Sequence, residues 1–341
     1  MAAIGIDTHK RTLAACAVDG VGGVIDERTF DNERDGFSLL GAWATQVAPG
    51  ATIGVEGSAS YGAAAARHLV DIGFDVREVP PQLSRRERDR SRRPGKSDPG
   101  DALAIARVTA RETDLPPIRL ENETTELGLL LDARENLVHA QTQARNRLHA
   151  HLVVLLPGYS RTAPRLVRAP QLDVIERALV PLVGIRSDLA RELLAEIRRL
   201  GRRATEFERL IKVRVDGHPL LDLPGAGALT TARLIAESGD LGRFRSADAF
   251  AMLAGVAPIP ASSGEVRRMR LNRGGNRQLN RALYTIAQSQ ALHHEPAKAY
   301  LTRKRADGKS RPEALRCLKR QLVRRVFHLL LAGQPAATLA A

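Results

Sequence analysis

The chain has 341 residues, enough for two or three domains, and 43% of them are hydrophobic. Lys and Arg outnumber Asp and Glu by 52 to 38, and the formal charge of +14 favours a polyanionic partner, most often nucleic acid. Its two cysteines, Cys16 and Cys317, exclude a disulfide framework and a Cys-rich zinc site, and no apolar run is long enough to cross a membrane. We therefore expect a cytoplasmic, nucleoid-associated protein. A genome that favours Arg would explain part of the surplus of basic residues.

The first hundred residues predict an α/β domain, which we place at residues 1–115. A Gly-rich turn at 19–23 is typical of a hairpin between two strands. The apolar segments predict strands at 3–7, 11–18, 23–30, 52–55 and 74–79, with helices at 36–47 and 61–72. This order describes a mixed sheet with helices packed against it.

A basic segment, residues 85–93, follows the last of these strands. We expect a solvated loop or the end of a basic helix. The functional alternative is a phosphate contact made by Arg85, Arg86, Arg92 and Arg93.

Two long helices are predicted next, at 123–155 and 172–211. Their apolar residues recur at the 3-4 spacing of a coiled coil, which predicts an antiparallel coiled-coil arm at 122–214. The apolar seam of this arm would be used internally or for dimerisation. A helical C-terminal domain at 218–334 and a tail at 335–341 complete the chain.

Four acidic residues are candidate metal ligands. Asp7 ends the first strand and Glu56 follows the fourth, so neighbouring strands would bring both carboxylates to one edge of the sheet. Asp98 and Asp101 begin a helix three residues apart and share one of its faces. Four carboxylates are what two divalent ions need. Locally, however, Asp98 fits an N-cap before Pro99, Asp101 fits the helix dipole, and Asp7 fits a turn.

A Gly-rich turn opens a helix in the C-terminal domain, within LDLPGAGALTTA at 221–232. Gly225 and Gly227 would expose backbone N–H groups as a phosphate seat, in a pattern similar to a helix-hairpin-helix. The alternative is a turn that only ends a helix.

A serine doublet, Ser262 and Ser263, precedes Gly264 and a run of arginines. Such a serine is usually a turn residue, and as a nucleophile it would need its proton removed and its target phosphate held by cations. No paired histidine is evident, so the metal site would have to assist. The arginines that could hold the phosphate are Arg267, Arg268, Arg270, Arg273 and Arg277.

Three blocks resemble, in order, those of the DEDD insertion-sequence transposases, the family usually called IS-one-ten. They are GIDTHK at 5–10, VEGSASYG at 55–62 and KSDPGDA at 96–102. The resemblance implies a RuvC-like, RNase H-type N-terminal domain in which Asp7, Glu56, Asp98 and Asp101 bind magnesium, as two ions per site. The C-terminal block is similar to the family's serine-bearing domain, where the nucleophile falls on Ser263, with Ser262 as the adjacent alternative. A phosphoserine-DNA intermediate is then implied, with the serine acting beside the carboxylates of another protomer.

The sequence is thus interpreted as that of a transposase or recombinase that cuts and rejoins double-stranded DNA as a homodimer or homotetramer. The resemblance further implies guidance by a structured, element-encoded RNA, often called a bridge RNA. The alternatives are a site-specific invertase of the same family, a RuvC-like junction nuclease, a non-catalytic nucleic-acid-binding protein and an assembly factor.

Overall fold

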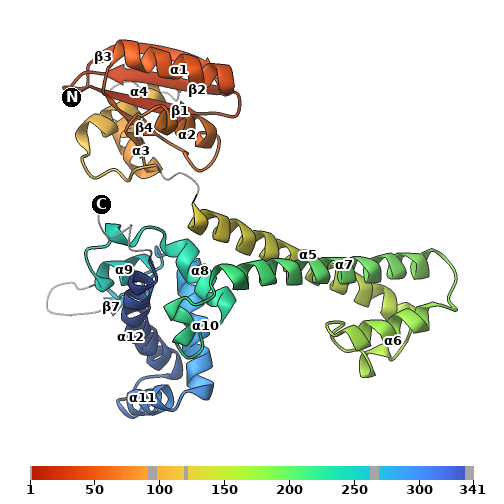
Figure 1. Ribbon diagram of the computed structural model, residues 1–341. Helices are drawn as coiled ribbons and strands as arrows, with labels where there is room; N and C mark the ends of the chain where they lie inside the picture. The colour runs from red at the N-terminus through yellow and green to blue at the C-terminus, as the bar shows by residue number, and fades with distance from the viewer. Residues whose placement is uncertain (1, 91–97, 119–121, 262–268, 335–341) are drawn as a thin grey trace. The chain divides into compact units, whose positions relative to one another are not determined.

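The computed structural model describes residues 2–90, 98–118, 122–261 and 269–334, with the side chains of Arg90, Asp98 and Pro99 outside this description. The chain forms two compact units, Met1–Leu120 and Glu121–Ala341 (Figure 1). Both cysteines are free. Within the described ranges, no helix is long and apolar enough to span a membrane.

The first unit contains a five-stranded sheet with the order β3-β2-β1-β4-β5. Strand β2 runs antiparallel to β1 and β3, whereas β4 is parallel to β1 and β5 is parallel to β4. This mixed α/β arrangement agrees with the RNase H-type order that was expected. The strands are β1 (Ala3–Thr8), β2 (Thr12–Val18), β3 (Val24–Asp31), β4 (Thr52–Val55) and β5 (Val76–Glu78).

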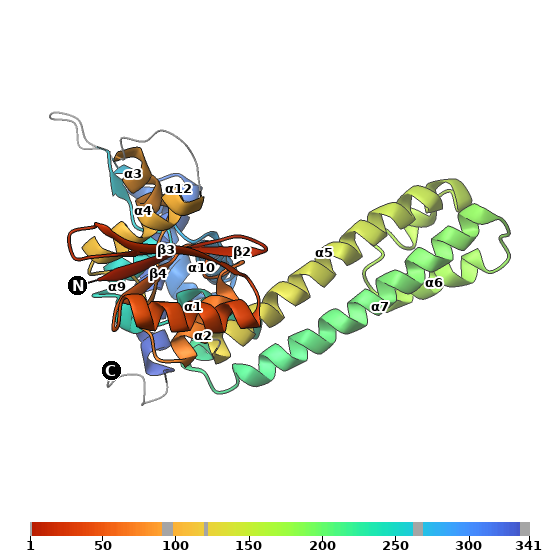
Figure 2. The same cartoon turned by 90° about the horizontal axis from the view of Figure 1, so that it is seen from above.

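Successive residues of the strands face opposite sides, so the sheet has two different cores. Large side chains such as Ile4 and Ile6 pack with helices α1 (Arg34–Val47) and α2 (Ala63–Asp71). Small side chains such as Ala3 and Cys16 pack with helix α4 (Asp98–Arg111). Figure 2 shows α1 and α2 on one side of this sheet, and α4 on the other together with α3 (Pro81–Arg90).

Two glycines allow α4 to lie directly on the sheet. Gly5 of β1 and Gly54 of β4 are partners in the sheet register. A Cβ atom on Gly5 would overlap the backbone of Ala102 and Ala106, and one on Gly54 would overlap the Thr109 side chain. The beginning of α4 is thereby held close to the strands that carry Asp7 and Glu56.

Replacing Gly5 with Ala is therefore expected to lower the free energy of unfolding of the first unit by about 3 kcal/mol, because the backbone of α4 has to move. Urea unfolding can be followed through Trp43, the single tryptophan of the chain, which is buried in this unit. Gly50→Ala is the control: its φ of 72° makes it strained, but nothing among the described residues lies within 4 Å of the added atom. It should cost only about 1–2 kcal/mol. Equal losses for both variants would contradict the close approach of α4.

The second unit begins with the arm. Helix α5 (Glu123–Leu155) has the predicted bounds, but the single helix predicted at 172–211 is wrong. The structure has α6 (Ala169–Leu179) and α7 (Ile185–Arg214) in its place. Pro181 cannot donate a helical hydrogen bond and Gly184 has a φ of 113°, so the segment between them turns the chain.

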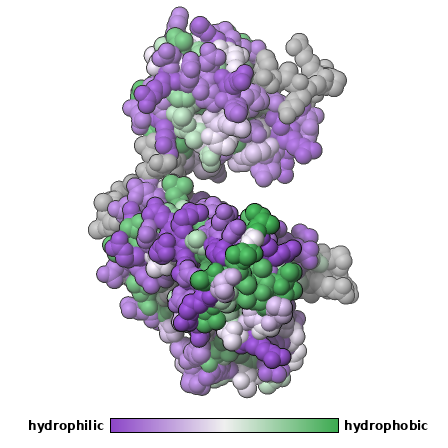
Figure 3. Space-filling model, turned by 90° about the vertical axis from the view of Figure 1, so that its right-hand side faces the viewer, coloured by the Kyte–Doolittle hydropathy of each residue, from purple (hydrophilic) through white to green (hydrophobic). Residues whose placement is uncertain are grey.

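Helices α5 and α7 lie side by side and antiparallel (Figures 1 and 2). Arg134 donates to Glu208 at 2.9 Å, and Gln141 donates to the carbonyl of Ile197 at 2.9 Å. Apolar residues of the two helices, such as Leu148 and Ile197, are buried in one cluster. The apolar seam of the arm is therefore covered within the chain. Apolar side chains also gather on the face of this unit seen in Figure 3, and exposed ones at the end of the arm include Val153, Val154, Val180, Val183 and Ile185.

The rest of the second unit is a helical domain, as predicted, built around buried residues such as Phe250, Leu283 and Phe327. Its elements are α8 (Ala228–Ser238), α9 (Ala247–Leu253), the strands β6 (Ile259–Pro260) and β7 (Met269–Arg270), α10 (Arg277–His293), α11 (Glu295–Ala306) and α12 (Arg311–Ala332). Short 3₁₀ helices occur at Tyr159–Arg161, Pro219–Asp222 and Leu241–Arg243.

Candidate active site

Asp7 and Glu56 lie on adjacent parallel strands at the same edge of the sheet. Ile6 is paired with Val55 in the register, and the N–H of Glu56 donates to the Ile6 carbonyl at 3.2 Å. The Thr8 hydroxyl donates to the Glu56 carbonyl at 2.9 Å, which ties the two strand ends together. The backbone therefore presents both carboxylates from fixed positions.

Asp101 lies in the first turn of α4 and is 5% exposed. The guanidinium of Arg88 approaches its Oδ1 at 3.3 Å, and no described group donates a hydrogen bond to this oxygen. A buried carboxylate oxygen held by one cationic contact is suited to a divalent cation. Asp98 opens α4, and its side chain is outside the described residues.

The side chains of Asp7, Glu56 and Asp101 are of the type that binds magnesium, because each offers carboxylate oxygens from a rigid helix or strand end. Among the side chains that the structure describes, no three Asp, Glu, His or Cys residues are grouped closely enough to hold a metal ion. That set does not include Asp98.

Three further residues touch the acids and were not assigned a role from the sequence. The Ser84 hydroxyl donates to Oε2 of Glu56 at 2.5 Å, and Nε2 of His9 lies 3.2 Å from Oδ2 of Asp7. Arg88 is the third. Ser84 and Arg88 belong to α3, whose second half is the basic helix end that was one of the two expectations for residues 85–93. The segment is a helix that begins at Pro81, a residue favourable at a first helical position.

Glu78 is a further acid at this edge, because it ends β5 beside β4. Its carboxylate accepts hydrogen bonds from the Ser58 hydroxyl and from the backbone of Ser58 and Gly57, in the turn after Glu56. Burial raises the pKa of Glu78, these hydrogen bonds oppose the rise, and the charge of Glu56 adds to it. Glu78 could have been found from the sequence, because it is an acid near the end of a third predicted strand.

The basic residues predicted to contact nucleic acid are only partly described. Arg85 and Arg86 are exposed on α3, while Arg92 and Arg93 lie outside the described residues. The two serines, Ser262 and Ser263, also lie outside them, as do Arg267 and Arg268. Arg270, Arg273 and Arg277 are exposed between β7 and the first turn of α10.

The Gly-rich turn does open a helix, α8. Gly225 has a φ of 86°, and an added Cβ would lie 2.9 Å from Cβ of Ser289 on α10, so packing explains this glycine. Gly227 is the N-cap of α8 and has no described atom within 4 Å of the position of a Cβ. Only Gly227 leaves open space for a ligand.

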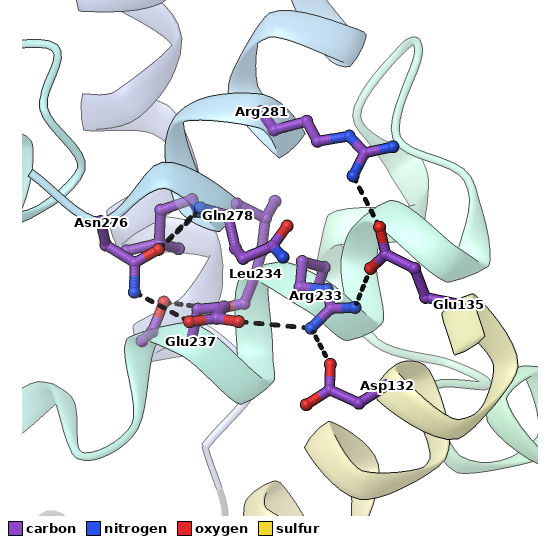
Figure 4. A network of polar contacts seen from close by, with 10 residues as sticks. Asp132, Glu135, Arg233, Leu234, Glu237, Asn276, Gln278 and Arg281 are labelled. Carbon is purple, nitrogen blue, oxygen red and sulfur yellow. Dashed lines mark hydrogen bonds and ion pairs between the residues drawn. The ribbon is translucent and has the colours of Figure 1, made fainter. Parts of the chain in front are cut away.

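A polar network joins α5, at the base of the arm, to α8 and α10 (Figure 4). Arg233 of α8 is 12% exposed and contacts Asp132 at 2.7 Å, and its other partners are Glu135 at 3.1 Å and Glu237 at 3.3 Å. Asn276, the N-cap of α10, donates to Glu237 at 2.8 Å. The network thus fixes the start of the helix that follows the serine segment.

Arg233→Ala is expected to destabilise the packing of α5, α8 and α10 by about 2 kcal/mol, because it removes the charge-assisted contacts that a largely buried guanidinium makes with three carboxylates. Hydrogen exchange in α8 and α10 measures this effect. The matched control is Arg281→Ala, which removes a largely exposed partner 2.8 Å from Glu135. Its expected effect is below about 1 kcal/mol. If protection is unchanged in Arg233→Ala, the network does not position α10.

Two models of known protein families match this chain, one over the sheet domain and the first arm helix and the other over part of the C-terminal helical domain. Residues 4–157 match the model of the DEDD transposases of IS110 type, described as "Transposase", and residues 217–302 match the "Transposase IS116/IS110/IS902 family". The molecule is thus a transposase, an enzyme class that cuts and rejoins DNA. The chain belongs to the IS116/IS110/IS902 family of insertion-sequence transposases.

Relatives match most of the chain. An IS110 43.6 kDa protein of Streptomyces coelicolor is 28% identical, over 82% of this chain and 81% of its own. An IS900 42 kDa protein of Mycobacterium paratuberculosis is 25% identical, over 99% and 98%. A probable family 20 transposase of Pseudomonas aeruginosa is 28% identical, over 78% and 77%. Among solved structures, Thermus thermophilus RuvC with a Holliday junction is 16% identical, with a TM-score of 0.28 over 35% of this chain and 99% of its own.

Proposed function

We propose that this transposase cuts and rejoins double-stranded DNA with Asp7, Glu56, Asp98 and Asp101 as its metal-binding acids and Ser263 as its nucleophile. The observation that carries the proposal is the pairing of the strand ends at Asp7 and Glu56, held by the Glu56 N–H and the Thr8 hydroxyl. Nothing in the packing of the sheet requires two acids there. Two Mg²⁺ ions, when bound, would neutralise charge on the reacting phosphate.

The protein's own groups then have distinct tasks. Ser84 orients the Glu56 carboxylate through its hydrogen bond, and Arg88 balances the charge of Asp101. The exposed Arg270, Arg273 and Arg277 hold the phosphate by charge. The serine oxygen attacks phosphorus, the bond to the leaving strand breaks, and that strand's oxygen takes a proton. A hydroxyl of the joining strand next attacks the phosphoserine, and the serine recovers its proton.

Strand exchange needs more than one active site, so we propose a homodimer or homotetramer. The apolar seam between α5 and α7 is used within the chain, so other surfaces would make the subunit contacts. A structured guide RNA stays part of the proposal as a partner.

The experiment incubates the protein with duplexes taken from the DNA on both sides of its gene and with RNA transcribed from the same DNA, in Mg²⁺ or in EDTA. A protein–DNA adduct that survives denaturant, followed by a joined product, is expected only in Mg²⁺. Inversion of a segment beside the gene would identify the invertase, and cut ends without an adduct would identify a junction nuclease. Binding without any cut would leave a non-catalytic nucleic-acid-binding protein.

A further inference from the structure

The turn between α11 and α12 carries cations that the proposed chemistry does not use. Arg305, Lys309 and Arg311 are exposed and line a hollow of about 530 Å³. Thr302, Gly308 and Ser310 complete its lining. None of the three cations makes an ion pair or side-chain hydrogen bond with a described residue. The turn follows the segment matched by the family model, which ends at residue 302.

The acids nearest to these cations in sequence are already engaged. Asp307 pairs with Lys304 at 2.9 Å, and this contact lowers the pKa of Asp307. Glu313 accepts hydrogen bonds from the Ser310 hydroxyl at 2.6 Å and backbone N–H at 2.9 Å, in the capping box of α12. Lys309 interacts with both acids only at longer range, and among the described residues no acid lies within ion-pair distance of Arg305, Lys309 or Arg311.

Folding gives a reason for only one of the three cations. Arg305 lies in the last turn of α11, where a positive charge interacts favourably with the helix dipole. Lys309 and Arg311 flank the N-cap of α12, where the same dipole disfavours positive charge. A local feature that opposes the fold is typical of a functional surface.

We propose that this turn binds the phosphate backbone of duplex DNA. Guanidinium, ammonium and hydroxyl groups are the groups that contact phosphates. No aromatic ring lines the hollow, and the ring of nearby Tyr300 lies beneath Arg303 at 5.5 Å and Lys304 at 5.9 Å. Base stacking, the usual means of holding single strands, has no platform here. The proposal does not depend on the carboxylates or the serine.

The test compares two full-length variants that each lose three positive charges. The site variant combines Arg305→Gln, Lys309→Gln and Arg311→Gln. The control combines Arg186→Gln, Arg199→Gln and Arg209→Gln, three exposed arginines of α7 without ion pairs to described residues. Affinity for a fluorescent duplex is measured by anisotropy over a range of salt concentrations in EDTA, so that no cleavage occurs.

The site variant is expected to bind at least about tenfold more weakly at low salt, with a log–log salt slope reduced by about two to three, since each lost phosphate contact removes about 0.9. The control should stay within about threefold of the wild type. Equal losses in both variants, or an unchanged slope in the site variant, would overturn the proposal. A loss seen only with a structured RNA in place of the duplex would also overturn it. The same measurements in an Asp7→Asn background should give the same loss, which separates this surface from the proposed chemistry.

Discussion

Asp7→Asn is expected to reduce cleavage of the transposon-end duplex by about a thousandfold or more while leaving duplex binding unchanged. The substitution keeps the shape of the side chain but removes its charge, at the central strand of the sheet. Without the Asp7 carboxylate the metal ions would be held poorly and would no longer neutralise the charge on the reacting phosphate. A loss of about 4 kcal/mol in transition-state stabilisation corresponds to a thousandfold lower rate. Single-turnover cleavage in Mg²⁺ and anisotropy in EDTA measure the two properties separately.

The control for this variant is Asp71→Asn, at the exposed end of α2, whose side chain has no hydrogen bond or ion pair with described residues. It should cleave within about twofold of the wild type, because surface charges far from the reacting phosphate are screened. If Asp7→Asn cleaves as fast as Asp71→Asn, the acids at the strand ends do not act in the reaction.

Ser263→Ala is the second large effect. Alanine has no oxygen with which to attack phosphorus, so the covalent adduct and strand exchange should fall by a factor of about 10⁴ or more. Ser262→Ala is the matched control, because it removes the same hydroxyl one residue earlier in the chain. It should still form the adduct. Adduct formation is measured by gel mobility under denaturing conditions.

Two results would contradict this assignment. If Ser262→Ala fails and Ser263→Ala still forms the adduct, the nucleophile is Ser262. If each single variant and the double variant all recombine, neither serine is the nucleophile, and water or a DNA hydroxyl attacks directly.

Strands β1, β2 and β4 were predictable because each is a short, buried apolar segment bounded by turns. Strand β3 is mostly exposed and charged, and the Gly-rich hairpin turn before it was its signal. The arm was only partly predictable. The apolar spacing continues through Leu179, Leu182 and Leu189, so it indicated one helix, whereas Pro181 and Gly184 interrupt it. The backbone properties of Pro181 and Gly184 therefore ended the helix even though the apolar spacing continued.

The same limit applies to the candidate site. Glu56 could be placed beside Asp7 because parallel neighbouring strands end at one edge of a sheet. The contacts made by Ser84 and Arg88 could not, because they depend on how α3 packs against α4, and the charged segment 85–93 carries no apolar period that reveals a helix. The hydrogen bond from Ser84 to Glu56 joins residues 28 positions apart.

Mass spectrometry of the trapped protein–DNA adduct shows which residue is bonded to the DNA. The wild-type protein is incubated with transposon-end duplex in Mg²⁺, denatured, and digested with protease and nuclease. We expect one modified peptide that carries a nucleotide phosphodiester on Ser263, and no such peptide from Asp7→Asn. Joined DNA products that form without any modified peptide, or a phosphodiester on a residue outside the serine doublet, would contradict it.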